Sequence, residues 1–374
     1  MLRTLRRLLA CPGLEFAEPP QLLADGVTAR AFELRLAGAP PAISGPLVCR
    51  VLCDGGEART GDPLLAESAL HNALAATGFP VPRVFATGTG GDELGAPFML
   101  MERVAGRPAF GVFLGALAAS VPLAALGIGA APLVVCLAAW GGMALLLRRL
   151  HKVDGGAVAA ELARAGANAE RLGPDAALTE LDQLIRAANA KQLEPALDWL
   201  REHRQPLSGA PTVCHGDYWY GNVMVSAQGV HLLDWTQAGL AHRELDLGWM
   251  SLQHYSRLPM AVVDPLFDWL WLPVRPLTWL FMAPIRWIYR LGGGVDRDRL
   301  AYYTALCATR LLANGAKLER EWRARGGSRP AELSAWGSPH TRALLARRLR
   351  RICGVDVRSQ EPEDPKLTPR DLQG

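Results

Sequence analysis

Hydrophobic and polar positions in the first hundred residues predict a small β-rich lobe. Residues 32–36 alternate apolar and polar side chains with the period of a strand, and residues 46–52 and 97–102 are short apolar runs of strand length. Between the last two, residues 64–76 repeat apolar positions at helical spacing. The predicted order of elements in residues 21–104 is therefore strand, strand, helix, strand.

Helical periodicity dominates the rest of the chain. A basic amphipathic pattern predicts a first helix over residues 2–9, and a later apolar run continues into Arg148 and His151 as a long helix. His151 closes that helix next to Asp154, where we expect a hydrogen-bonding support rather than a base. Further helices are predicted over residues 161–171, 178–190, 195–203 and 296–324, and a last one begins at Ser338-Pro339. Residues 355–374 combine prolines with charges and are expected to be disordered.

The most unusual stretch runs for forty residues, from Pro108 to Leu147, without a single charge. A membrane-spanning helix needs about 20 apolar residues, so the stretch is long enough to span a bilayer. Its end, residues 138–147, belongs to the predicted long helix, and residues 108–135 are then too short for two full spans. The pattern predicts a re-entrant or surface-lying helical hairpin, broken at Pro122 and Pro132.

A second apolar segment, residues 265–291, mixes aromatic and basic side chains with prolines. These side chains are Trp269, Trp271, Trp279, Trp287, Tyr289, Arg275, Arg286 and Arg290. The mixture is typical of helices at a membrane headgroup boundary, and it also occurs in a helical cap whose tryptophans are buried. The sequence leaves both interpretations open and predicts that residues 108–135 and 265–291 form one continuous surface.

Composition excludes few classes of function. The 40 basic and 36 acidic residues leave a formal net charge of +4, too balanced to indicate a nucleic-acid-binding protein. The seven cysteines are scattered without a CxxC pair and suit a reducing compartment. Only three residues separate Arg7 from Cys11, far short of the apolar core of a signal peptide. We expect a cytoplasmic protein, either dissolved or peripheral at the inner face of the membrane.

The residues that carry chemistry lie between His215 and Asp234. The carboxylate of Asp217 precedes the carboxamide of Asn222 by five residues on a predicted loop, and Asp234 ends the short strand His231-Leu232-Leu233. One carboxylate to position a hydroxyl, with a carboxylate and an amide to hold Mg²⁺ on nucleotide phosphates, is the set used in phosphoryl transfer. The alternative, a turn cap and a strand end without chemistry, is disfavoured because the features occur together.

The spacing HGDxxxxN, the apolar strand running into Asp234-Trp235, and the following Glu244-Leu245-Asp246-Leu247 resemble the aminoglycoside phosphotransferase and choline kinase superfamily. The resemblance implies an α+β, bilobal protein-kinase-like fold. It implies an N-lobe over residues 1–104, a helical C-lobe over residues 105–354 that contains both apolar inserts, and the tail. It also implies that Asp217 is catalytic, that Asn222 and Asp234 are metal ligands, and that His215 and Asp246 support the loop.

The same resemblance implies a nucleotide site in the N-lobe. Arg50 on a strand would pair with Glu67 on the helix and approach the phosphates of ATP, although members of the superfamily more usually carry Lys there. The phosphate loop would be residues 24–30, which offer Gly26 and Thr28. Met101 and Glu102 would form the hinge that meets adenine.

These features predict an ATP- and Mg²⁺-dependent kinase that phosphorylates a small alcohol. An aminoglycoside is a polycation and needs an acidic acceptor site, whereas the segments that the resemblance places on the acceptor side are apolar or carry arginine. We therefore predict a hydrophobic or lipid-like acceptor, met at a membrane surface through residues 108–135 and 265–291, and no nucleic-acid partner. The alternative is a pseudokinase or a membrane-associated nucleotide-binding scaffold, which Arg50 and the glycine-poor phosphate loop favour.

Overall fold

The structure is a computed structural model that describes residues 1–25, 29–52, 62–89, 95–125, 131–207, 209–255, 283–326 and 339–357. Its contacts divide the chain into two compact units. The first combines Met1–Pro174, Leu207–Asp246 and Leu280–Gly294, and the second combines Asp175–Pro206, Leu247–Trp279 and Val295–Gly374. Every described residue of the predicted site lies in the first unit. The lobe boundaries at residues 104 and 354 stay a prediction.

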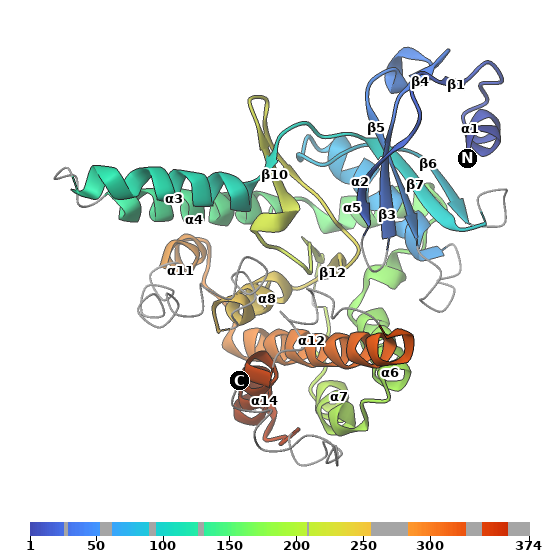
Figure 1. Cartoon of the computed structure of the whole chain (residues 1–374). Helices are drawn as coiled ribbons and strands as arrows, with labels where there is room; N and C mark the ends of the chain where they lie inside the picture. Colours follow the sequence, from blue (N-terminus) through green and yellow to red (C-terminus); the bar gives the residue numbers. More distant parts are fainter. Residues whose placement is uncertain are drawn as a thin grey trace. The chain divides into compact units, whose positions relative to one another are not determined.

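A five-stranded antiparallel sheet with the strand order β2-β3-β5-β7-β6 forms the N-terminal part of the first unit (Figure 1). Its strands are β2 (Gln21–Asp25), β3 (Ala29–Leu34), β5 (Leu47–Leu52), β6 (Val84–Thr89) and β7 (Pro97–Glu102), and α2 (Asp62–Ala76) packs against β6 and β7. The predicted order of strand, strand, helix, strand is confirmed in β3, β5, α2 and β7. The sequence pattern missed β2, which does not alternate, and β6, which contains Gly88.

The N-terminal helix α1 (Leu2–Leu8) joins the core of this sheet, as its amphipathic pattern predicts. Leu5 and Leu14 are fully buried, in one cluster with Leu34, Leu47 and Phe98. Burying one such side chain contributes about 1.5–3 kcal/mol. The cluster therefore fixes the sheet on which Arg50 is carried.

Smaller sheets follow, and two of them lead directly to the predicted catalytic residues. In the described part of the chain they pair β1 (Glu15–Phe16) with β4 (Leu36–Ala37), β10 (Val223–Ser226) with β8 (Arg107–Pro108) and β11 (Gly229–Leu232), and β9 (Thr212–Cys214) with β12 (Gly239–Ala241). β9 ends immediately before His215, and β11 ends two residues before Asp234.

The uncharged run forms two helices that lie side by side in Figure 1, α3 (Ala109–Ala125) and α4 (Ala131–Leu150). The predicted pair of helices is present, whereas its re-entrant or surface-lying placement at a membrane stays a prediction. The predicted break at Pro122 is wrong, because α3 continues to Ala125. Pro132 lies in the first turn of α4, where a missing N–H loses no helical hydrogen bond. Of the second apolar segment, residues 265–282 lie outside the described residues, and the rest forms α11 (Ala283–Leu291), which packs against α4.

The helices after α4 follow the predicted periodicity with one correction. α5 (Gly155–Arg164) begins behind the capping carboxylate of Asp154 and ends well before residue 171, so the predicted helix over residues 161–171 is wrong. Gly166 adopts a φ of +74°, a conformation that stops a helix, and Asn168 then caps a short 3₁₀ turn, Ala169–Leu172. Other 3₁₀ turns are Pro41–Ile43, Lys191–Leu193 and Tyr220–Asn222.

The second unit is helical and consists of most of α6 (Pro174–Ala188), α7 (Glu194–Glu202), the greater part of α8 (Glu244–Tyr255), α12 (Arg297–Arg325) and α14 (Pro339–Cys353). α12 packs against α7 and α14, and Asp296 caps its N-terminus. The predicted helices over residues 296–324 and from Pro339 are confirmed. Of the predicted disordered tail, residues 358–374 lie outside the described part of the chain.

Candidate active site

The loop that carries His215, Gly216 and Asp217 begins where β9 ends, and its second residue must be glycine. Gly216 has a φ of +76°, which side chains other than glycine rarely adopt. A Cβ atom at this position would lie 1.9 Å from the carbonyl oxygen of Gln237. The backbone of the loop therefore passes directly over the segment that follows Asp234.

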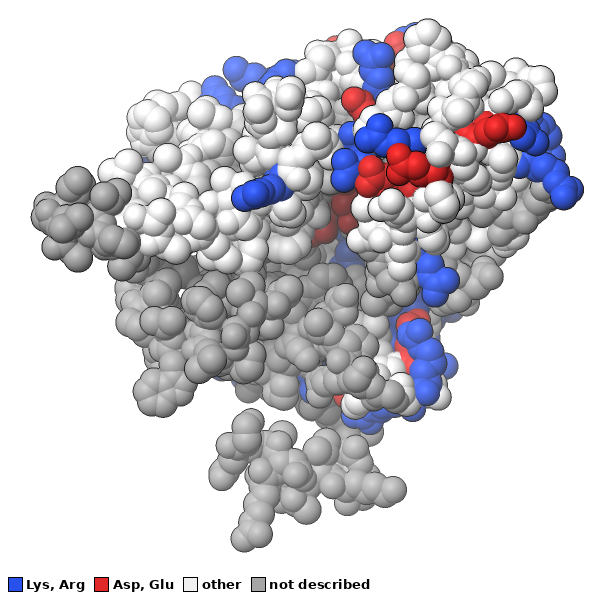
Figure 2. Space-filling view, turned by 45° about the horizontal axis from the view of Figure 1, so that its top comes forward, with Lys and Arg blue, Asp and Glu red and all other residues white. Residues whose placement is uncertain are grey.

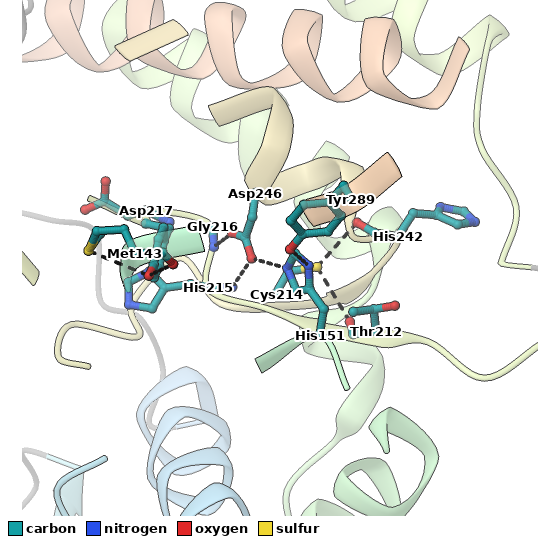
Figure 3. Close-up of polar contacts among 11 residues, drawn as sticks. Met143, His151, Thr212, Cys214, His215, Gly216, Asp217, His242, Asp246 and Tyr289 are labelled. Carbon is teal, nitrogen blue, oxygen red and sulfur yellow. Dashed lines mark hydrogen bonds and ion pairs between the residues drawn. The ribbon is translucent and has the colours of Figure 1, made fainter. Parts of the chain in front are cut away.

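Asp246, in the first turn of α8, holds this loop in place (Figure 3). Its Oδ2 accepts the backbone N–H of His215 at 2.9 Å, and its Oδ1 accepts that of Gly216 at 2.7 Å. Burial by itself would raise the pKa of this fully buried carboxyl, but the hydrogen bond and charge of His151 and the proximity of His215 lower it below its ordinary value. Asp246 is thus an anion that orders the backbone just before Asp217.

His151, which follows α4, completes this brace. Its Nε2 lies 2.9 Å from Asp246 Oδ2, and its Nδ1 lies 2.6 Å from the hydroxyl of Tyr289 on α11. Cys214 is close enough that His151, Cys214 and Asp246 have the ligand types of a small metal site. The geometry argues against one, because both His151 nitrogens have partners and burial raises the pKa of the Cys214 thiol well above its ordinary value.

The ring of His215 connects the loop to the strand that precedes Asp234. Its Nε2 donates to the carbonyl of Leu233 at 2.8 Å, and its Nδ1 accepts the N–H of Asp217 at 3.2 Å. Burial lowers the pKa of His215, although Asp246 opposes that shift. A neutral ring with both nitrogens engaged has no position left for a substrate proton, so the geometry favours a supporting role over a general base.

Asp217 and Asn222, five residues apart in the sequence, lie in contact. The side-chain amide of Asn222 donates to the backbone carbonyl of Asp217 at 2.9 Å and to its Oδ2 at 3.0 Å. The backbone carbonyl of Asn222 accepts the N–H of Leu233 at 2.7 Å, which ties Asn222 to the residue before Asp234. This backbone hydrogen bond therefore joins the loop that carries Asp217 and Asn222 to the end of the strand before Asp234.

Asp234 has a strained backbone and a basic neighbour. Its φ of +59° is uncommon for a residue other than glycine and typical of functional sites. One of its oxygens accepts the hydroxyl of Thr236, and Arg50 donates to that hydroxyl at 2.9 Å. Burial alone would raise the pKa of Asp234, but the charge of Arg50 and the Thr236 hydroxyl outweigh burial and lower it.

Arg50 and Glu67 form the ion pair that the resemblance implies, with Arg50 Nη1 2.6 Å from Glu67 Oε1. Met101 and Glu102 lie at the end of β7, and the N–H of Glu102 donates to the carbonyl of Arg83 at 2.9 Å. That N–H is therefore engaged within the sheet, and the hinge assignment stays a prediction. Gly26 and Thr28 lie outside the described residues.

The oxygen atoms of Asn222 and Asp234 are of the type that suits a divalent cation. Asn222 commits its amide nitrogen to Asp217, which leaves its carbonyl oxygen Oδ1 as the atom able to bind a cation. Together with the ionised carboxylate of Asp234 it offers the hard oxygen ligands that Mg²⁺ and Ca²⁺ prefer. The residues present therefore fit the metal that the resemblance implies.

Sequence analysis missed Thr236 and Tyr289 as members of this network. Thr236 follows Asp234 by two residues, so the local sequence offered a signal, since a hydroxyl at that spacing often bonds back to a carboxylate. Tyr289 is 138 residues from His151, and no local pattern relates them.

Comparison with known proteins gives a consistent picture. The model of the family described as "Phosphotransferase enzyme family" matches residues 21–277. No curated protein matches the chain. A solved structure described as a "putative aminoglycoside phosphotransferase" from Ralstonia eutropha JMP134 is 18% identical, with a TM-score of 0.54 over 94% of this chain and 96% of that chain.

Two further solved structures contain ligands. An amicoumacin kinase in complex with AMP-PNP, Ca²⁺ and Ami is 16% identical, with a TM-score of 0.51 over 94% of this chain and 92% of that one. A thermostable mutant of aminoglycoside phosphotransferase APH(4)-Ia, in a ternary complex with ADP and hygromycin B, is 13% identical, with a TM-score of 0.50 over 92% and 97%. At these identities the likeness shows the fold, an α+β arrangement with an N-terminal sheet and a helical C-terminal region.

Proposed function

The chain belongs to the phosphotransferase enzyme family, and we propose that it transfers the γ-phosphoryl group of ATP to the hydroxyl of a small hydrophobic or lipid-like alcohol. In this reaction the alcohol oxygen forms a bond to the γ-phosphorus while the bond from that phosphorus to the bridging oxygen breaks. The hydroxyl proton passes to the carboxylate of Asp217, and ADP leaves. Positioning and electrostatics supply most of the acceleration in such transfers, because the transition state is loose.

The observation that carries this proposal is the double contact of Asn222 with Asp217. The bond to Oδ2, at 3.0 Å, holds the Asp217 side chain toward the residue that we assign to the metal, and the bond to the backbone carbonyl, at 2.9 Å, fixes the backbone of Asp217. A carboxylate fixed by a neighbouring amide is preoriented to receive a hydroxyl.

Arg50 and a cation held by the proposed metal ligands would supply positive charge that complements the nucleotide phosphates. A divalent cation bound by Asn222 and Asp234 would neutralise charge on the transferring phosphoryl group. The guanidinium of Arg50 is anchored by Glu67 and directed to the Asp234 side by Thr236. Because a guanidinium stays protonated at any physiological pH, Arg50 would present a permanent positive charge to the nucleotide phosphates. The nucleotides named in two solved relatives, AMP-PNP and ADP, support ATP as the donor.

The choice of an apolar acceptor rests on what surrounds the catalytic loop. Tyr220, three residues after Asp217, stacks on Phe113 of α3 at 5.7 Å between ring centroids and meets Trp140 of α4 edge-on at 5.0 Å. No acidic residue occurs between Glu102 and Asp154, the part of the chain that contains both helices. A polycation such as hygromycin B, present in one relative, would find no anionic partner on this wall.

The proposal is tested by screening a library of alcohols for ATP consumption and for a phosphorylated product, with and without anionic liposomes. We expect turnover with amphiphilic alcohols and none with aminoglycosides. The Asp217→Asn variant is the matched blank, because it removes the proposed proton acceptor and little else. ATP binding without consumption on any acceptor would favour the alternative of a nucleotide-binding scaffold, for which the replacement of the usual lysine by Arg50 is the supporting observation.

A further inference from the structure

The arm, which we define as residues 109–125 of α3 and 131–142 of α4, has only apolar residues among its described exposed positions. Its described exposed residues are Gly111, Val112, Gly115, Ala116, Ala118, Ala119, Leu133, Val134, Leu137, Ala138 and Gly142. The side chain of Val134 is 60% exposed, whereas the polar side chains of Ser120 and Cys136 are buried. A surface of this kind is rare on a protein without a partner.

We propose that this arm docks the protein on the surface of an anionic lipid bilayer, with the end of α3 and the start of α4 in one leaflet. A protein partner would require a polar rim and on the order of ten hydrogen bonds across a typical interface. The described exposed side chains of the arm offer neither a charge nor a hydrogen-bond donor. A hydrocarbon layer requires none, because a helix satisfies its backbone groups internally.

The length of the arm fits one leaflet rather than a full span. Phe113 and Trp140 mark its base, where both contact Tyr220. From Phe113 to the end of α3 at Ala125 is 12 residues, and from Trp140 back to the start of α4 at Ala131 is nine. At 1.5 Å per residue these stretches reach about 18 and about 14 Å. Half of a hydrocarbon core about 30 Å thick is about 15 Å.

The rest of α4 belongs to the core of the protein. Among the described residues, one helical segment, Leu133–Leu150, is long and apolar enough to cross a membrane. Met143, Leu147 and Leu150 in its second half are buried, and the hydroxyl of Tyr218 donates to the backbone carbonyl of Met143 at 2.7 Å. This half of the helix therefore packs against the catalytic region through Met143, Leu147 and Leu150, whereas Leu145 in the same half is 60% exposed and adds to the apolar surface of the arm.

Charge at the base of the arm matches an anionic surface. Arg107, two residues before α3, is exposed beside the base of the arm. Among the described residues in the left part of Figure 2, toward which the arm extends, no acidic side chain is visible. Basic residues that flank an apolar hairpin are attracted to anionic headgroups, by about 1 kcal/mol each near the surface.

Helix α11 adds an interfacial anchor beside α4. Arg148 donates to the carbonyl of Ile288 at 2.6 Å, which fixes α11 against the base of α4. Trp287 and Leu291, one turn apart, are 65% and 67% exposed, and Arg290 between them is exposed as well. Tryptophan and arginine beside an apolar face are typical of the headgroup boundary.

The contact of the arm with Tyr220 gives the docking a role in catalysis. Tyr220 lies between Asp217 and Asn222 in the sequence and packs on both helices of the arm. A bilayer that receives the arm would therefore lie close to the catalytic loop, and an alcohol at headgroup depth would be the acceptor. This last step rests on the proposed function, whereas the docking does not.

Flotation with vesicles of phosphatidylcholine, with and without phosphatidylglycerol, tests the docking. The wild type is expected to float with the anionic vesicles. The variant Leu133→Ser/Val134→Ser/Leu137→Ser should bind the anionic vesicles at least about tenfold more weakly than the wild type, because it removes the transfer free energy of three apolar side chains. The control variant Leu8→Ser/Leu207→Ser alters side chains of comparable exposure, 42% and 36%, and should bind like the wild type.

Three outcomes would overturn the proposal: a wild type that floats with neither vesicle, a triple variant that floats like the wild type, or an arm that proves to be a contact between copies. Light scattering detects the last, as a dimer that the triple variant converts to monomer. Thermal unfolding and ATP binding of the variants show whether they remain folded. If the wild type floats but phosphorylates no alcohol in any condition, the docking stands and the proposed function fails.

Discussion

Arg50 and Glu67 are joined by an ion pair of 2.6 Å between Nη1 and Oε1, on side chains that are only 16% and 9% exposed. Removing one partner of such a pair leaves a buried charge uncompensated, which costs about 3–5 kcal/mol. We expect Glu67→Gln to lower the free energy of unfolding by at least about 3 kcal/mol and to raise KM for ATP, because the Arg50 guanidinium loses its anchor. Urea unfolding and initial-rate kinetics measure the two effects.

A surface pair provides the comparison for that variant. Glu161 and Arg164 lie three residues apart on α5 and are 41% and 68% exposed. Exposed pairs contribute about 0–1 kcal/mol, so Glu161→Gln should leave stability and KM nearly unchanged. Equal stability of the two variants would show that the Arg50–Glu67 pair does not hold the N-terminal sheet and α2 together.

Neutralising Asp217, the proposed proton acceptor, and Asp234, the proposed metal ligand, is expected to impair activity in different ways. Asp234→Asn should abolish metal-dependent turnover, because it removes the charge assigned to the cation, while the thermal unfolding temperature stays close to that of the wild type. Asp217→Asn should retain ATP binding and lose transfer. Titration calorimetry with ATP and Mg²⁺ separates the cases. Turnover of Asp234→Asn within about threefold of wild type, or loss of ATP affinity in Asp217→Asn, would contradict the assigned roles.

Stability should decrease as the pH falls below neutrality, in part because of His71. This side chain is buried and its Nδ1 donates to the carbonyl of Pro82 at 3.0 Å; burial lowers its pKa, although Glu67 opposes the shift. An unfolded histidine has a pKa of about 6.5, so below that pH the unfolded chain binds a proton that the folded protein does not. The contribution of neutral His71 is thus complete above about pH 6.5 and declines as the pH falls toward its lower folded pKa.

Unfolding by urea at several pH values measures this effect, and His71→Gln is the variant that isolates it. The variant should be less stable than the wild type at neutral pH, since the replacement disturbs a packed site, but its stability should fall less steeply with acid. His215 has its pKa lowered in the same direction and remains in the variant, so part of the slope should persist. An unchanged slope would exclude His71 as a source of the pH dependence.

A comparison of Gly216 with Gly78 distinguishes two costs of adding a side chain: backbone strain and a steric clash of the Cβ with its neighbours. Gly216 and Gly78 have φ values of +76° and +75°, but a Cβ would meet the Gln237 carbonyl at Gly216 and open space at Gly78. Gly78→Ala should cost about 1 kcal/mol of stability, the strain of a left-handed residue alone. Gly216→Ala should also displace the loop and abolish turnover. Thermal unfolding with activity assays checks both, and an active Gly216→Ala would show that the loop adjusts.

Local sequence was sufficient for the elements that carry the site but not for the contacts that hold it. The strand alternation in residues 32–36 and the spacing from Asp217 to Asn222 are short-range signals; the structure contains β3, and it places Asp217 and Asn222 in contact. Asp246 is hydrogen-bonded to His215 and His151, which are 31 and 95 positions away in the sequence. Arg50 donates to Thr236, which is 186 positions away. Such contacts depend on tertiary packing, which the hydrophobic pattern of a single segment does not predict.

The same limit explains the errors in secondary structure. Residues 161–171 carry helical periodicity, yet Gly166 ends the helix because its left-handed conformation costs a glycine little. Beyond Pro122 the helix continues for three residues, a case in which neighbouring structure outweighs an unfavourable residue. The prediction missed β6 because an interior glycine, Gly88, weakens the strand pattern by removing side-chain contacts. The pairing of β6 with β7 stabilises the strand despite that loss.

The arginine at position 50 also determines how this protein would respond to chemical labelling. Probes that report on kinases through the amine of a lysine beside the nucleotide phosphates acylate a neutral amine, and a guanidinium is not converted to a neutral nucleophile at physiological pH. The chain has four lysines, Lys152, Lys191, Lys317 and Lys366, and none lies on the strand that carries Arg50. A proteome-wide survey that relies on such a label would therefore pass over this protein even while it turned over ATP.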